Sequence, residues 1–226
     1  MNRRKRLVRV ALAASTFVIA ACATPYKEAI RPFESAEPCC ESMADLPFRM
    51  LAVERKEKIE LNTASPAFNF DSGKSYFTAF ELPPFSGPYR IVIESLFVGD
   101  NVSTSYVFYP HILTLDESHN IIRSSGKGLF AVRRAGLTET WGYLRKLSGS
   151  IEVCEKNRDE RFLVIMTTEE LLHLQTPELA WSGMPVVIPS AGVFGYIPTG
   201  KELKQIPHSP VGKLTIWIES VEKCKQ

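Results

Sequence analysis

Four side chains that could bind a metal ion or transfer protons lie within nine residues of one another: His111, Asp116, Glu117 and His119. Imidazole and carboxylate groups are common ligands of divalent metals. However, His111 begins an expected strand and the other three occupy the polar turn that follows it, so no single face presents all four. The sequence therefore predicts an ordinary turn, with no metal ligand and no cofactor site.

A hydrolase would need a serine or cysteine nucleophile placed beside a base. The chain has no Gly-x-Ser-x-Gly elbow, and its cysteines are better explained as disulfides. Gly126-Lys127-Gly128 is too short for a phosphate-binding loop and is expected to form a hairpin turn. We therefore expect a protein that is not an enzyme.

Aromatic side chains are the stronger candidates for ligand contacts. Aromatic faces backed by polar groups are a common way to bind sugar rings in β-sandwiches. Four aromatic residues lie in stretches that are expected to be irregular, where exposed aromatics more often serve binding: Trp141, Tyr143, Trp181 and Tyr196. Trp217 lies in an expected strand and is expected to pack between elements.

The N-terminus has the pattern of a signal peptide. Residues 1–9 hold five positive charges, and residues 10–21 form an apolar run of twelve residues. A membrane-spanning helix needs about 20 apolar residues, whereas the shorter run suits an export signal. Ile19-Ala20-Ala21-Cys22 resembles the lipobox of bacterial lipoproteins. This resemblance implies removal of residues 1–21 and attachment of fatty acids such as palmitate to Cys22.

The same resemblance implies where the protein works. Retention in the inner membrane is associated with Asp after the lipidated cysteine, and this chain has Ala23, so we expect a lipid anchor at the periplasmic face of the outer membrane. Residues 22–37 are expected to form a tether. The leader holds five of the positive charges, so its removal changes the net charge from +2 to −3, which argues against a nucleic-acid partner.

Four cysteines remain after lipidation of Cys22: Cys39, Cys40, Cys154 and Cys224. An even number of cysteines in an oxidising compartment predicts disulfide bonds. A bridge between neighbouring cysteines distorts the peptide that joins them, so we expect Cys39 and Cys40 each to pair with one of Cys154 and Cys224. Zinc is disfavoured because adjacent cysteines lack the spacing of zinc knuckles.

The elements that must position these residues are mostly strands. About ten short apolar or alternating segments are separated by turn residues, and Lys213 to Glu219 alternates strictly. Residues 167–170, Thr-Thr-Glu-Glu, have capping-box spacing and predict a helix. The pattern predicts an all-β fold, a jelly-roll-like two-sheet antiparallel β-sandwich with one or two short helices, in a single domain of residues 38–226.

From Tyr76 to Glu219 the order of segments resembles the maltose-operon periplasmic protein family. The stretches that carry the resemblance are "VFYPHILTLDESHNII", "RFLVIMTTEELLHLQT" and "IPHSPVGKLTIWIES". Their family motifs correspond to Pro110 to Asp116, Val164 to Glu169 and Gly212 to Ile216. The resemblance implies an envelope protein associated with carbohydrate uptake and supplies no catalytic residue.

We therefore expect a cell-envelope lipoprotein that is accessory to carbohydrate uptake, with an oligosaccharide as its candidate ligand. The alternative is a structural or interaction lipoprotein that binds a protein partner at the outer membrane. The genes beside this one would discriminate the two readings.

Overall fold

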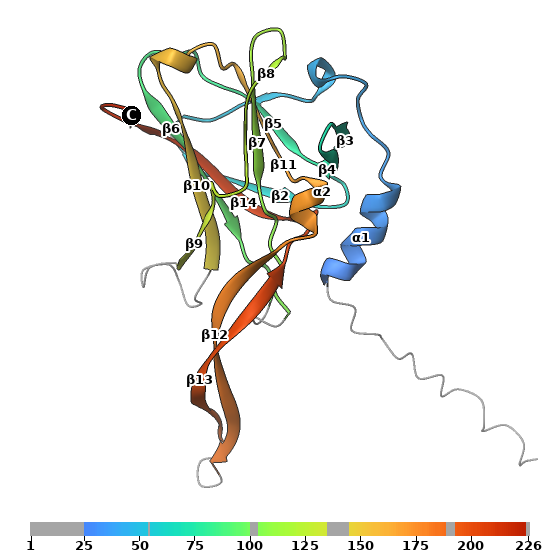
Figure 1. Cartoon of the computed structure of the whole chain (residues 1–226), viewed down its shortest axis with the longest axis vertical. Coiled ribbons are helices and arrows are strands. Elements are labelled where there is room, and N and C mark those ends of the chain that lie inside the picture. Colours follow the sequence, from blue (N-terminus) through green and yellow to red (C-terminus); the bar gives the residue numbers. More distant parts are fainter. Residues whose placement is uncertain (1–24, 54, 100–103, 135–144, 189–192, 225–226) are drawn as a thin grey trace, which may run out of the picture.

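The computed structural model describes residues 25–53, 55–99, 104–134, 145–188 and 193–224. Two five-stranded sheets form a sandwich, which confirms the predicted all-β class (Figure 1). Sheet I has the order β1 (Arg49–Met50), β5 (Thr78–Glu81), β11 (Phe162–Met166), β7 (His111–Leu115) and β8 (Ile121–Ser125). Sheet II has the order β2 (Glu57–Leu61), β14 (Gly212–Ser220), β6 (Tyr89–Leu96), β10 (Arg145–Val153) and β9 (Ala131–Arg134).

Strand pairing is antiparallel within both sheets, apart from the short pair of β1 and β5, which is parallel. In sheet II, residues alternate between the core and the outer face, as a period of two requires. Leu214 and Ile216 of β14 are buried, and so are Ile91 and Ile93 of β6. The alternation predicted for residues 213–219 is therefore confirmed.

Trp217 lies on the outer face of sheet II, opposite the core. It is half-buried, its indole Nε1 donates to Glu219 at 2.7 Å, and the Lys56 ammonium lies 4.1 Å from its ring centroid. On this outer face the Trp217 ring contacts side chains from two segments, Lys56 before β2 and Glu219 of β14 itself.

The inner strands of sheet I are buried on both faces, which explains their continuous apolar sequences. Leu163 and Ile165 of β11 join the core between the sheets, whereas Val164 and Met166 face a second cluster on the other side. That second cluster is covered by the 3₁₀ turn η1 (Met43–Asp45) and by the hairpin of β3 (Ala67–Phe70) and β4 (Gly73–Tyr76). The N-terminal segment is thus part of the core packing.

Residues 25–35, which the sequence led us to expect as part of an irregular tether, form helix α1 (Pro25–Ser35). Tyr26, Ile30 and Phe33 follow helical spacing, and proline is tolerated at the first helical position. Phe33 packs edge-on against Tyr76 with ring centroids 5.3 Å apart, and Lys74 donates to the carbonyl oxygens of Glu34 and Ala36. The C-terminal end of α1 is therefore fixed to the sandwich. No helix in the described part of the chain is long and apolar enough to cross a membrane.

A long hairpin, which we call the arm, projects from one end of the sandwich (Figure 1). It consists of β12 (Gln175–Ile188) and β13 (Val193–Pro207), which pair along their whole length with one irregularity at Ser182 and Gly183. The expectation that Trp181 and Tyr196 lie in irregular segments is wrong, because both belong to these strands. Prolines are tolerated here because a two-stranded hairpin has only edge strands.

The predicted helix after β11 exists but is a single turn, α2 (Glu169–Leu172). Its N-cap is Thr168, whose hydroxyl accepts from Leu171 N at 3.1 Å, one residue later than the predicted capping box. The turn at Gly126 to Gly128 is also confirmed, but it carries the chain from β8 in sheet I to β9 in sheet II and closes no hairpin.

All four predicted cysteines are in disulfides, but the predicted pairing is wrong. Cys39 bonds Cys40, and Cys154 bonds Cys224, with Cα atoms 3.7 Å and 6.3 Å apart. Cys39 donates its backbone N–H to the carbonyl oxygen of Ala67 at the β3 hairpin, whereas the end of β14, which leads to Cys224, lies on the other side of the sandwich (Figure 1). Cysteines in these two places cannot bridge without moving the backbone.

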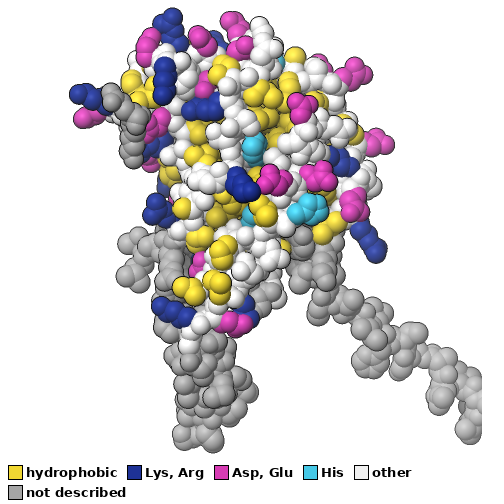
Figure 2. Space-filling view, in the orientation of Figure 1, with side chains coloured by type: hydrophobic (Ala, Val, Ile, Leu, Met, Phe, Trp, Pro, Cys, Tyr) yellow, Lys and Arg dark blue, Asp and Glu magenta, His cyan; other side chains and the backbone are white. Residues whose placement is uncertain are grey.

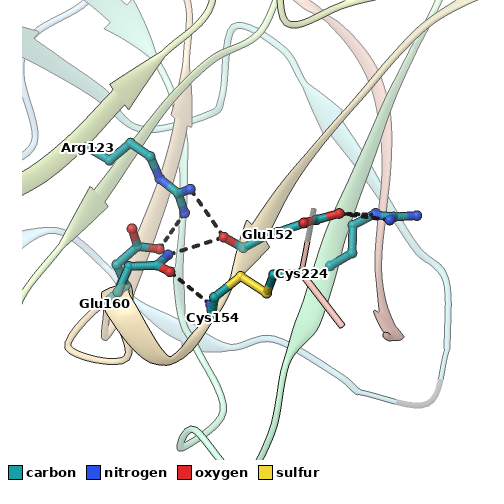
Figure 3. The surroundings of a disulfide bond; sticks show 7 residues. Arg123, Glu152, Cys154, Glu160 and Cys224 are labelled. Carbon is teal, nitrogen blue, oxygen red and sulfur yellow. Dashed lines mark hydrogen bonds and ion pairs between the residues drawn. A yellow bond between two sulfur atoms is a disulfide. The ribbon is translucent and has the colours of Figure 1, made fainter. Parts of the chain in front are cut away.

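The Cys154–Cys224 bridge stands beside a network of ion pairs (Figure 3). Arg123 of β8 pairs with the buried carboxylate of Glu160 at 2.5 Å and donates to the carbonyl oxygen of Glu152 at 3.2 Å. Burial, reinforced by the negative charge of Glu160, raises the pKa of Tyr89 to about 12. Together, the bridge and these contacts join sheet I, sheet II and the C-terminal segment.

Candidate functional site

A cleft of about 330 Å³ opens where the base of the arm meets the end of the sandwich, and we call it the arm-base cleft. It lies beside α2, between strands of sheet II and the first residues of β12. Its lining residues are Tyr109, Lys127, Phe130, Val132, Leu147, Leu171, Leu174, Gln175, Thr176, Pro177 and His208. This volume is at the lower end of the range of small-molecule sites, roughly 300–1,000 Å³.

The floor of the cleft is organised by His208, which is 2% exposed and follows β13 directly. Its Nδ1 lies 2.6 Å from the carbonyl oxygen of Leu171, and its Nε2 lies 2.8 Å from the hydroxyl of Thr176. A carbonyl only accepts, so Nδ1 carries the proton, and Nε2 accepts from Thr176. Burial lowers the pKa of His208, and the hydrogen bond to Leu171 acts in the opposite direction without cancelling this effect.

Both ring nitrogens of His208 are therefore used in holding α2 and the arm together. A general base needs a free nitrogen within reach of a substrate proton. His208 is thus placed to position the walls of the cleft.

One wall of the cleft is aromatic. The ring of Tyr109 lies against His208 with centroids 4.8 Å apart and a tilt of 30°, and Phe130 meets Tyr109 edge-on at 5.8 Å. Gly149 of β10 makes room for Phe130, because a Cβ at that position would lie 2.7 Å from its ring. Val132 and Leu147 extend this apolar surface along sheet II.

The rim of the cleft is polar. Lys127 lies 2.8 Å from Glu170 of α2, and this exposed pair raises the pKa of the lysine and lowers that of the glutamate. Gln175, at the start of β12, is exposed and carries two amide donors and an acceptor. The cleft thus combines an aromatic wall with hydrogen-bonding groups at its mouth.

The position of the arm relative to the cleft is fixed by an ion pair. Arg145 Nε of β10 lies 3.1 Å from the buried Glu178 carboxylate of β12, and the same guanidinium donates to the carbonyl oxygen of Leu179 at 3.3 Å. These contacts hold the start of β12 against sheet II.

The described lining of this cleft includes none of the four predicted aromatic residues. Trp141 and Tyr143 lie outside the described residues. Trp181 and Tyr196 are placed by their backbones in the arm, opposite Lys201 and Pro185 respectively. Sequence reasoning instead missed Tyr109, Thr176 and His208, which come from three distant segments. The one signal was a histidine between two prolines in "IPHSP", a poor context for a strand.

Of the residues first considered for metal binding, His111 begins β7 and the other three lie in the turn that follows it, as predicted. Asp116 accepts from the backbone N–H of Ser118 and of Asn120, and hydrogen bonds from Asn120 are the main cause of its lowered pKa. His119 stacks on Phe162 with centroids 4.5 Å apart, and His111 is bonded to Ser124 at 2.7 Å.

Within the described part of the chain, one cluster of a carboxylate and two cysteines has the spacing of a metal site. Glu152, Cys154 and Cys224 have potential ligand atoms within 4.8 Å of one another. The two sulfurs are joined in a disulfide, so they offer no thiolate to a metal.

The chain was compared with known proteins. No curated protein and no solved structure matches it. A family model described as maltose operon periplasmic protein precursor (MalM) matches residues 72–181, a segment that runs from β4 to β12 and includes most of the cleft-lining residues. The predicted resemblance to this family of periplasmic proteins is therefore confirmed over residues 72–181.

Proposed function

We propose that this protein is a non-enzymatic, lipid-anchored accessory to carbohydrate uptake and that it binds an oligosaccharide in the arm-base cleft. The observation that carries the proposal is the aromatic wall of Tyr109 and Phe130 next to polar groups at the mouth. Sugar rings have an apolar face that packs on aromatic rings and hydroxyl groups that need hydrogen-bond partners. The family name, which refers to a maltose operon, favours a malto-oligosaccharide.

The anchor is proposed at Cys22, in the outer membrane and on its periplasmic side. The basic leader, the twelve-residue apolar run and the lipobox-like sequence support it, together with Ala23 at the following position. An anchored binding protein would keep its ligand near the membrane through which sugars enter.

The test uses residues 23–226, which lack the leader and the lipidation site. Malto-oligosaccharides of increasing length are titrated by calorimetry against this protein. We expect saturable binding, weakened about tenfold by Gln175→Ala, since one hydrogen bond to a ligand is worth about 1 kcal/mol or slightly more. Val132→Trp, which fills the cleft from a half-exposed position, should abolish binding while circular dichroism shows an intact fold.

Two control variants separate this site from others. Trp217→Ala changes the outer face of sheet II and should leave binding unchanged, and Trp141→Ala tests the aromatic segment suggested by the sequence. Binding lost in Trp141→Ala but retained in Val132→Trp would move the site away from the cleft. No heat change with any malto-oligosaccharide at millimolar concentration would refute sugar binding.

A further inference from the structure

The arm differs in composition from the rest of the domain. All 22 residues from Leu179 to Gly200 are uncharged, although 23% of the whole chain is charged and about five charges would be expected in that length. Charged residues appear at both borders of the stretch, at Glu178 on β12 and at Lys201 and Glu202 on β13. The distal part of both strands and the connection between them are therefore entirely uncharged.

The described base of the arm already exposes apolar side chains. Leu179 and Leu203 lie opposite each other across the two strands and are 46% and 57% exposed. Figure 2 shows hydrophobic side chains at the base of the arm, next to the lysines and acidic residues that border it. Exposed apolar surface of this kind is typical of a contact with another protein or with a membrane.

The direction of the arm favours the membrane. In Figure 1 the arm and the N-terminal end of α1 point toward the same end of the molecule. Cys22, the proposed lipid anchor, lies three residues before α1 begins. Strands of 14 and 15 residues extend over roughly 45 Å, so an arm in this direction reaches the membrane that holds the anchor.

We propose that the distal arm inserts into the surface of the phospholipid bilayer and is a second membrane contact beside the lipid at Cys22. The direction of the arm supports this proposal only together with the proposed anchor at Cys22. The uncharged composition of the arm and its exposed leucine pair support it independently of the anchor. Trp181 lies opposite Lys201, at the border between the charged and the uncharged part of the arm. Tryptophan is enriched at membrane–water interfaces, so this border is expected to lie at the membrane surface.

The geometry of a hairpin limits this insertion to a shallow depth. Unpaired backbone groups are costly in hydrocarbon, and no other described strand pairs with the outer edge of β12 or of β13. Pro185 and Pro198 remove two N–H donors from the paired, uncharged region. At the depth of the headgroup boundary the remaining edge groups can bond to water and to lipid headgroups.

The test is co-sedimentation of residues 23–226 with phosphatidylcholine vesicles and with mixed phosphatidylethanolamine–phosphatidylglycerol vesicles. This protein lacks Cys22 and no sugar is added, so the result is independent of lipidation and of saccharide binding. We expect binding to both kinds of vesicle that does not weaken at high salt, because the arm carries no charge to screen. Val187→Glu combined with Phe194→Glu, an opposed pair in the distal arm, should reduce binding at least about tenfold.

Ile121→Glu is the matched control, since Ile121 is 47% exposed on β8 at the other end of the molecule and should leave binding unchanged. Brominated phosphatidylcholine should quench tryptophan fluorescence in the wild type and in Trp217→Phe, and quench it much less in Trp181→Phe. Wild-type protein that stays in the supernatant with both vesicles would overturn the proposal, as would equal binding by the double variant. A specific protein crosslinked to the arm without any vesicle binding would overturn it in favour of a protein partner.

Discussion

Arg145 on β10 and Glu178 on β12 form an ion pair at 3.1 Å, with side chains only 15% and 6% exposed. This pair is where the arm is joined to sheet II, and the carbonyl oxygen of Leu179 accepts from the same guanidinium. The carboxylate of Glu178 has little access to water, so Arg145 is needed to compensate for its charge.

We predict that Arg145→Ala lowers the free energy of unfolding by about 3 kcal/mol, because it leaves a buried carboxylate unpaired. Chemical denaturation measures the loss, and hydrogen exchange should show faster exchange at the start of β12. The double variant Arg145→Met/Glu178→Leu should recover most of the loss. Lys204→Ala, which removes an exposed pair with Glu202, is the control and should cost less than about 1 kcal/mol. If Arg145→Ala and Lys204→Ala lower the free energy of unfolding by similar amounts, the ion pair of Arg145 with Glu178 does not have the role described here.

The two disulfides should differ sharply in their effect on stability. Cys154 and Cys224 are separated by 70 residues, and a loop of that length gives about 4 kcal/mol in the chain-entropy model. Cys39 and Cys40 are adjacent and close almost no loop. Cys224→Ser should therefore lower the unfolding midpoint strongly, and Cys39→Ser combined with Cys40→Ser only slightly.

Non-reducing peptide mapping checks the pairing on which this prediction depends. A peptide that contains residue 39 or 40 crosslinked to one that contains residue 154 or 224 would show that the connectivity described here is incorrect.

The stability of the domain should depend on pH through His208. Burial lowers the pKa of His208, so the folded protein binds this proton less readily than the unfolded chain, where the pKa is about 6.5. The contribution is complete above about pH 6.5 and is lost as the pH falls below that value toward the folded pKa.

Thermal unfolding of the wild type and of His208→Gln between pH 5 and 8 measures this effect, and the variant should show a shallower slope below pH 6.5. His111 also has a pKa lowered by burial, so His111→Gln should reduce the slope by its own separate share. Equal slopes in the wild type and in His208→Gln would show that His208 does not titrate with unfolding.

Acylation of Cys22 is predicted from the sequence alone. Cells given a fatty acid with a clickable label should incorporate it into the wild type and not into Cys22→Ala. The variant should also appear in the soluble periplasmic fraction, while the wild type sediments with outer membranes. Equal labelling of both proteins would refute the anchor.

The sandwich was predictable because its strands follow simple periodicities. The alternation of Leu214 and Ile216 with polar neighbours reflects one buried face, and the continuous "FLVIM" of β11 reflects two. Helix α1 was also readable in the spacing of Tyr26, Ile30 and Phe33, but charges and prolines in the same stretch argued for an irregular tether.

The arm and the cleft were not predictable for physical reasons. Pro185 and Pro198 are unfavourable in central strands, so their strands read as irregular, yet a two-stranded hairpin has only edges. The cleft brings together Tyr109, Thr176 and His208 by long-range pairing, and no local pattern specifies that pairing. The predicted disulfide pairing was wrong because the sequence shows the cost of a vicinal bridge but not the distance between the alternative partners.

The vicinal bridge has a consequence for the order in which the chain is made. Cys39 and Cys40 emerge during synthesis before either of their possible wrong partners, and bonding each other requires no long-range contact. Cys154 and Cys224 are 70 residues apart in the sequence, so they can meet only after the strands between them have been made. Early closure of the first pair removes both thiols from the reaction, so the second pair is left with a single choice. The neighbouring cysteines thereby prevent scrambled crosslinks in a domain whose strand pairings form late.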